Sequence, residues 1–184
     1  MRKNKAHNSL RYHFQEGEPI LVDANVWLYL QPPASNPAPP FARRYSAAMK
    51  NLIEAKAKPI VDCLVLSEYI NRYLRIEYNA LYQAKYPNYK AFRTSGDFKY
   101  VARSAVAEAR QILSLATSLD TALSEVNIAD ILQGAETGTF DFNDGMLVEM
   151  CRLRGWKLLT DDADMQVGGI EVLTTNPRLL KACS

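Results

Sequence analysis

The sequence contains few of the residues that build soft-metal sites or histidine-based catalytic centres. Its 184 residues include only three cysteines and two histidines. The cysteines are far apart and form no C-x-x-C motif, and both histidines lie within the first 13 residues. A zinc site made of Cys and His, or a catalytic triad built on histidine, is therefore nearly excluded from the interior of the fold. The simplest interpretation of the cysteines is reduced thiols in a cytoplasmic protein.

Long apolar runs and a phosphate-binding glycine loop are also lacking. The longest apolar runs fall far short of the ~20 residues that a membrane span needs. The basic residues near the amino terminus are not followed by the apolar segment of a secretory signal. No G-x-x-x-x-G-K-[S/T] motif occurs, which argues against nucleotide-driven chemistry. We therefore expect a cytoplasmic protein without a membrane partner.

The formal net charge is only +2, but the charges are unevenly distributed. Residues 72–110 contain eight basic and three acidic residues, whereas residues 120–164 contain ten acidic and three basic residues. This asymmetry suggests that a polyanion binds near an acidic metal site. Two solvated helix faces would explain it equally well.

Short apolar runs alternate with segments of helical periodicity. Strands are expected at residues 20–22, 59–61, 156–160 and 170–173, and helices at residues 41–58, from 68 past 82, 98–116, 128–135 and 144–154. The alternation predicts an α/β fold, with a mainly parallel sheet and helices on both faces. We expect one domain over residues 18–184, preceded by a basic tail (residues 1–17) that is free to be flexible. Five prolines within residues 32–40 predict a stiff loop.

Four carboxylates from separate regions are expected at one edge of this sheet: Asp23, Glu68, Asp144 and Asp162. Asp23 ends the first strand and Asp162 follows a late strand, while Glu68 and Asp144 each open a helix, with Ser67 as the N-cap before Glu68. The carboxyl ends of parallel strands form the ligand crevice of such sheets. Like charges at ~4 Å repel by ~1 kcal/mol in water and by more when partly buried, so a divalent cation would stabilise the cluster. Oxygen ligands favour Mg²⁺ or Mn²⁺ over zinc or copper.

Such a site suits phosphodiester hydrolysis, because a bound metal activates water and neutralises charge on the phosphate. Structural alternatives remain for individual acids. Asp23 can cap a turn, and Glu68 and Asp144 can be first-turn acids that the helix dipole favours by typically 0.3–1 kcal/mol. Asp141 and Asn143 compete with Asp144 as the N-cap, and Asp141 competes with it as a metal ligand.

Four short motifs occur in a recognisable order. They are an apolar strand followed by D-x-N (residues 20–27), a glutamate at a helix start (66–68), D-G followed by apolar residues (144–148), and an apolar strand followed by T-x-D (158–165). Together they resemble the motifs of the PIN-domain family, which includes the VapC-type toxins of bacterial toxin–antitoxin pairs. The resemblance spans about residues 19–175, most of the chain.

This resemblance implies a three-layer α/β/α fold and a Mg²⁺- or Mn²⁺-dependent endoribonuclease. It assigns metal coordination and catalysis to Asp23, Glu68 and Asp144, with Asp162 as the fourth acid and with Asn25 and Thr160 as polar supports. The T-x-D spacing favours Asp162 over its neighbours, the turn or solvated acids Asp161 and Asp164. The implied partners are an RNA substrate, an antitoxin protein and a second copy of the chain in a homodimer. Gly145 and Glu149 depart from the family, which more often has alanine at these positions, and the proline-rich loop and residues 75–99 are long for it.

Two other classes of function remain. A PIN-like RNA-binding or regulatory module would lack cleavage activity, but such a module should have lost some of the acids. A receiver-like phosphoacceptor domain needs an acid pair beside its first strand and a lysine after a late strand, and neither occurs as expected. The Tyr-, Arg- and Lys-rich residues 73–93 would contact RNA by stacking and phosphate pairing, or would form core or an interface.

Overall fold

The computed structural model describes residues 2–184 and contains a six-stranded sheet in which every neighbouring pair of strands is parallel. The strand order is β1-β6-β5-β2-β3-β4. The strands are β1 (Lys5–Asn8), β2 (Pro19–Val22), β3 (Lys58–Val61), β4 (Thr117–Ser118), β5 (Lys157–Leu159) and β6 (Glu171–Thr174). The predicted α/β class and parallel sheet are confirmed.

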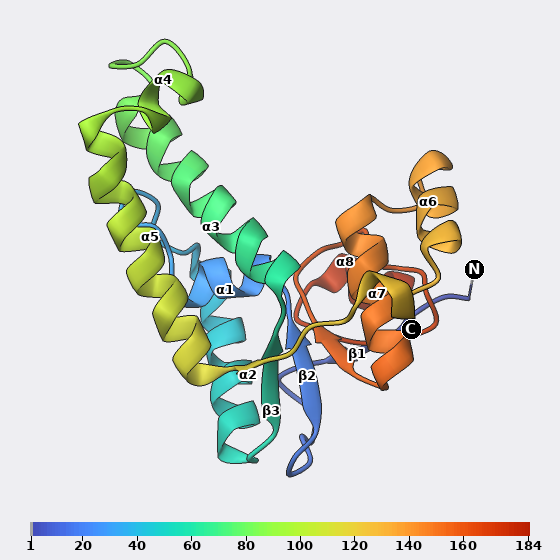
Figure 1. Cartoon of the computed structure of the whole chain (residues 1–184). Helices are drawn as coiled ribbons and strands as arrows, with labels where there is room; N and C mark the ends of the chain where they lie inside the picture. Colours follow the sequence, from blue (N-terminus) through green and yellow to red (C-terminus); the bar gives the residue numbers. More distant parts are fainter. Residues whose placement is uncertain (1) are drawn as a thin grey trace.

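Helices cover both faces of this sheet and complete the three layers (Figure 1). The α-helices are α1 (Ala24–Leu30), α2 (Arg43–Glu54), α3 (Cys63–Glu77), α4 (Tyr89–Arg93), α5 (Gly96–Leu115), α6 (Ile128–Glu136), α7 (Phe142–Arg154) and α8 (Pro177–Ala182). Shorter turns are η1 (Pro40–Ala42), the π-helical η2 (Tyr78–Tyr82) and η3 (Leu123–Glu125). Helices α1, α2, α3 and α5 lie on one side of the sheet, and α6, α7 and α8 on the other (Figure 1).

The central strands are buried on both faces, as in other fully parallel sheets. Ile20 and Leu21 of β2, Leu158 and Leu159 of β5, and Val172 of β6 are all 0% exposed. The polar residues begin where β2 and β5 end, at the edge that holds the predicted acids.

The segment predicted to be a tail instead contributes a strand. Lys5–Asn8 forms β1, which pairs in parallel with β6 from Lys5 opposite Glu171 to Asn8 opposite Thr174. Asn4, only 3% exposed, donates a hydrogen bond to the Met165 carbonyl (3.2 Å) and accepts one from the Ile170 amide (3.0 Å). This strand was missed because its sequence, Lys-Ala-His-Asn, has no apolar pattern and is stabilised by backbone pairing.

Helices α3 and α5 form an arm (residues 63–115) that extends beyond the sheet, with α4 at its tip (Figure 1). At the tip, Phe92 is 0% exposed and lies within 4.8–6.0 Å, between ring centroids, of five other aromatic rings. These rings belong to Tyr78, Tyr82, Tyr86, Tyr89 and Phe98. The tyrosines of the Tyr-, Arg- and Lys-rich stretch therefore pack mainly against one another. This agrees with the alternative in which the stretch forms core.

No helix within residues 2–184 is both long and apolar enough to cross a membrane.

Candidate metal centre

The carboxylate of Asp23 lies at the junction of β2 and β5. Its Oδ2 atom accepts hydrogen bonds from the Thr160 hydroxyl (2.6 Å) and from Asn25 Nδ2 (2.7 Å). Asp23 occupies the N-cap position of α1, yet its side chain makes no capping bond. Because the side chain is 5% exposed and held by two donors, its orientation is fixed toward the sheet edge.

Glu68 lies farther into its helix than its sequence context predicts. Helix α3 begins at Cys63, and its N-cap is Asp62, whose Oδ1 accepts the Val65 amide at 2.9 Å. The prediction that Ser67 caps the helix and that Glu68 opens it was wrong, because the apolar residues 63–66 read as a continuation of the preceding strand. Glu68 instead lies in the second turn, where its Oε1 pairs with Arg72 Nη1 at 3.1 Å.

Asp144 lies in the first turn of α7 and is not its cap. The N-cap is Asp141, whose Oδ1 accepts the Asp144 amide at 2.9 Å. The sequence left this role open among Asp141, Asn143 and Asp144 itself. Because Asp141 satisfies the helix terminus, the half-buried carboxylate of Asp144 is free for another role.

The three acids after β5 have different environments. The Asp161 carboxylate accepts hydrogen bonds from the Tyr29 hydroxyl (2.7 Å) and the Tyr45 hydroxyl (2.6 Å), one on each oxygen. Asp164 is exposed, and its amide donates to Asp162 Oδ1 at 2.8 Å. The Asp162 amide donates to the Thr160 hydroxyl at 3.0 Å. We call the residues that join the ends of these strands the β2–β5 seam: Asp23, Asn25, Thr160, Asp161 and Asp162.

Two of the four predicted acids, Asp23 and Asp144, have pKa values raised in part by the charges of the others. Burial, together with the charges of Glu68 and Asp162, raises the pKa of Asp23 to about 6, against the lowering effect of the hydrogen bond from Thr160. The pKa of Asp144 is raised to about 7, first by burial and then by the charges of four other carboxylates: Asp141, Asp162, Asp23 and Glu68. The fold thus brings acids from four chain regions toward one edge of the sheet.

The oxygen atoms of this cluster are suitable ligands for a hard divalent cation, although the side chains do not form a complete coordination site. Within residues 2–184, no three Asp, Glu, His or Cys side chains are arranged so that they could hold a metal ion. The ion pairs described for the same residues include Arg72 with Glu68 but no basic partner for Asp23, Asp144 or Asp162. An oxygen-rich cluster with raised pKa values and little neutralising charge favours a cation such as Mg²⁺.

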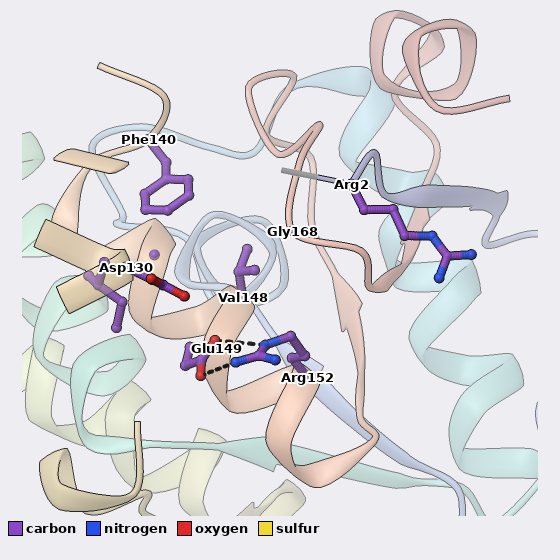
Figure 2. Close-up of a pocket in the computed structure, with 9 residues that line it drawn as sticks. Arg2, Asp130, Phe140, Val148, Glu149, Arg152 and Gly168 are labelled. Atoms are coloured by element: carbon purple, nitrogen blue, oxygen red, sulfur yellow. Dashed lines mark hydrogen bonds and ion pairs between the residues drawn. The ribbon is translucent and has the colours of Figure 1, made fainter. Parts of the chain in front are cut away.

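Two hollows adjoin helix α7. The larger, about 700 Å³, is lined by Asp144, Phe140 and Asp164, so it reaches one of the four acids. The smaller, about 200 Å³, is lined by Val148, Glu149 and Arg152 and by none of the four acids (Figure 2). In this cavity Arg152 Nε donates to Glu149 Oε2 at 2.9 Å, which explains how a buried glutamate is accommodated there.

Some residues at the site carried no signal in the sequence. The hydroxyls of Tyr29 and Tyr45 donate hydrogen bonds to Asp161, which lies 132 and 116 residues away in the sequence. No local sequence pattern indicates these two contacts. Arg72 was detectable, because Glu68 followed four residues later by Arg72 is a favourable ion pair on a helix.

The family-model comparison agrees with this architecture. The PIN domain model matches residues 20–171, most of the chain, so the protein belongs to the PIN-domain family. Members of this family are generally nucleases that use divalent metals. The predicted family is therefore confirmed.

The chain is similar to PAE2754 from Pyrobaculum aerophilum, at 17% identity and a TM-score of 0.44, with 84% of this chain and 90% of that one covered. It is also similar to FitAcB from Neisseria gonorrhoeae, at 19% identity and a TM-score of 0.48, with 84% and 96% covered. No curated protein matches the chain.

Proposed function

We propose that this protein is a Mg²⁺- or Mn²⁺-dependent endoribonuclease that hydrolyses phosphodiester bonds of RNA. The observation that carries the proposal is the convergence of four acids at the carboxyl edge of the sheet, where the charges of Glu68 and Asp162 help to raise the pKa values of Asp23 and Asp144. A cluster of like charges that is partly buried is costly unless a cation or a proton neutralises it. Membership of a family of nucleases supports the same reaction class.

In this proposal the four carboxylates hold the cation, and Asn25 and Thr160 keep Asp23 directed toward it. The bound metal would acidify the attacking water and neutralise charge on the phosphate. Asp161 has both carboxylate oxygens occupied by tyrosines, which makes it a positioning residue for the strand end and not a ligand. The groove of about 700 Å³ beside Asp144 would admit the substrate strand.

The basic arm supports a polyanionic substrate. Six of its basic side chains form no ion pair with an acid within the described chain: Arg75, Lys90, Arg93, Lys99, Arg103 and Arg110. Unpaired basic residues on exposed helices attract phosphate backbones without regard to sequence. We further propose a cytoplasmic toxin that an antitoxin protein restrains and that acts as a homodimer, on the strength of the motif resemblance.

The decisive test measures cleavage of end-labelled single-stranded RNA by the full chain. We expect Mg²⁺- or Mn²⁺-dependent products that excess EDTA abolishes. Asp23→Asn should lower the rate by at least about a thousandfold, as loss of a central catalytic group commonly does, and should keep the circular dichroism spectrum of the folded protein. Asp130→Asn, on the exposed side of α6, is the matched control and should cleave normally.

Undiminished cleavage by Asp23→Asn, or in excess EDTA, would contradict the proposal. RNA binding without any product, under conditions where the metal binds, would instead favour the non-cleaving RNA-binding module.

A further inference from the structure

A narrow slot lies beside the acids, between α1, α3 and the proline-rich loop. Its volume is about 140 Å³, and its walls include Leu28 and Tyr29 of α1, Ile76 of α3, and Pro33, Asn36 and Pro39 of the loop. Pockets for drug-sized ligands are typically about 300–1,000 Å³, so this slot has room for a single small ring system.

The proline-rich loop forms a fixed wall of the slot. The Tyr69 hydroxyl donates to the Gln31 carbonyl at 2.8 Å, and the Ser35 amide donates to Glu77 Oε1 at 3.0 Å. These bonds attach both ends of the loop's first half to α3. Because the prolines already restrict the backbone, and two anchors fix its position, the slot exists before a ligand arrives and binding costs little ordering.

The walls combine apolar faces with a few polar groups. Leu28, Ile76 and the prolines supply apolar surface. The ring of Tyr29 is held by its hydroxyl bond to Asp161 (2.7 Å) and by edge contact with Phe41, at 5.4 Å between centroids. At the rim, the exposed Asn36 side-chain amide forms no hydrogen bond within residues 2–184. A small slot with mainly apolar walls and a free amide, which can both donate and accept, suits the face and edge of a nucleobase.

Two residues of the slot are bonded directly to the acid cluster. Asn25 Nδ2 donates to Asp23 Oδ2 at 2.7 Å, and Arg72 Nη1 pairs with Glu68 Oε1 at 3.1 Å. The slot and the acids therefore share a wall. A molecule whose phosphate lies at the acids can place an adjoining group in the slot.

We propose that this slot receives one unpaired nucleobase of the substrate strand, close to the phosphodiester bond that is cut. The inference rests on the proposed nuclease function and extends it to substrate choice. The base stacks between the apolar walls, and Asn36 contacts its edge. Because the slot holds one base without its pairing partner, the enzyme selects single-stranded RNA and prefers particular bases at one position beside the cut.

Binding without catalysis gives the first test. Full-length protein in EDTA and low salt is titrated with fluorescent oligoribonucleotides that carry one abasic residue at successive positions. We expect one position at which base removal weakens binding by about tenfold, within the range known for stacking a base on an aromatic side chain. Ala38 also lines the slot. Ala38→Leu, which places a larger side chain there, should remove this difference. Ala34→Leu, on the exposed part of the same loop outside the slot, should preserve it.

Cleavage gives the second test. With Mg²⁺ or Mn²⁺, oligonucleotides that differ in one base are compared by kcat/KM. At one position we expect the best and worst bases to differ by at least about tenfold, as hydrogen-bonded base readout commonly provides. Asn36→Ala, which removes only an exposed side chain, should reduce this ratio to below about threefold. It keeps the test valid if Ala38→Leu fails to fold.

The outcomes separate the two proposals. Absence of metal-dependent RNA cleavage overturns the proposed function. Normal cleavage with equal rates for every base, or equal binding of every abasic oligonucleotide, overturns the slot proposal alone. Base dependence that survives in both slot variants also overturns it, since another part of the protein must then read the base.

Discussion

The β2–β5 seam and the α3–α5 arm hold their charged groups in opposite ways. In the seam, Asp23 is 5% exposed and Thr160 is 0% exposed, and the Thr160 hydroxyl donates to Asp23 Oδ2 across 137 residues. On the arm, Lys99 and Arg103 are exposed and have no acidic partner within the described residues. Burial thus makes the Asp23 charge costly and hydrogen bonds fix its position, whereas the charges of the arm are solvated. Changes to the seam should therefore alter both rate and stability, and changes to the arm should alter binding alone.

After the loss of Asp23 itself, the largest predicted effect comes from removing the Thr160 hydroxyl, which bonds to Asp23 and Asp162. Thr160→Val deletes the donor to Asp23 and the acceptor of the Asp162 amide. We expect cleavage to fall about 10–100-fold, as for other groups that orient metal ligands, and the free energy of unfolding to fall by about 1–3 kcal/mol. Thr160→Ser keeps the hydroxyl and should retain most of both. Equal losses in the two variants would show that packing of the methyl group matters instead.

Metal binding should stabilise the fold through the same residues. At a Mg²⁺ or Mn²⁺ concentration 100 times the dissociation constant, the expected gain is about 2.7 kcal/mol, measured as a rise in the thermal midpoint. Asp144→Asn should lose this gain. NaCl at matched ionic strength controls for screening of the acids, and an equal rise with NaCl would rule out a specific site.

A smaller effect should appear in the pH dependence of the metal-free protein. The pKa of Asp144 is raised by burial from 3.8 to about 7, so folding favours its protonated form. This contribution to stability is complete below the pKa of the unfolded chain and is lost as pH rises through 7. Between pH 5 and pH 8 the wild type should lose on the order of 2 kcal/mol relative to Asp144→Asn, after allowance for solvent screening. Denaturant titrations of both proteins, with Asp130→Asn as control, measure it. Parallel curves would contradict the assigned cause.

The smallest effect on the fold should come from the arm. Lys99→Gln combined with Arg103→Gln should change the free energy of unfolding by no more than about 0.5 kcal/mol, as is usual for surface sites. If these residues contact phosphates, the slope of log affinity for single-stranded RNA against log salt should become shallower by about 0.7 for each contact removed. Lys50→Gln, on α2, is the matched control. An unchanged salt slope would show that Lys99 and Arg103 do not contact the phosphates of the RNA.

The sequence predicted what depends on local pattern. An apolar run ending at Asp23, and the alternation of strands with helices, were sufficient for the sheet and for one acid at its edge. Glu68 was identified, but its position at the helix start was wrong, because apolar residues of a first helical turn look like a strand. Long-range contacts were beyond local pattern. The hydrogen bond from the Tyr45 hydroxyl to Asp161 joins chain segments that only the folded sheet brings together.

Two further features, the amino-terminal strand and the proline-rich loop, also depend on contacts that local sequence pattern does not indicate. The strand β1 has a polar sequence and exists because β6 offers an unpaired edge. The proline-rich loop was predicted to be stiff, yet its attachment to Tyr69 and Glu77 follows from the course of α3 and not from the prolines. Glu77 is also buried, which composition alone would not suggest for a glutamate.

The pairing of β1 with β6 has a consequence for the order of folding during synthesis. Asn4 contacts Ile170 across 166 residues, and Asp23 contacts Thr160 across 137. Contacts of such large sequence separation form slowly, because a long loop must close before they stabilise anything. The amino-terminal strand leaves the ribosome early and must wait for almost the whole chain before it can pair. The acids therefore come together only as the last strands are added, so a growing chain cannot carry a complete site.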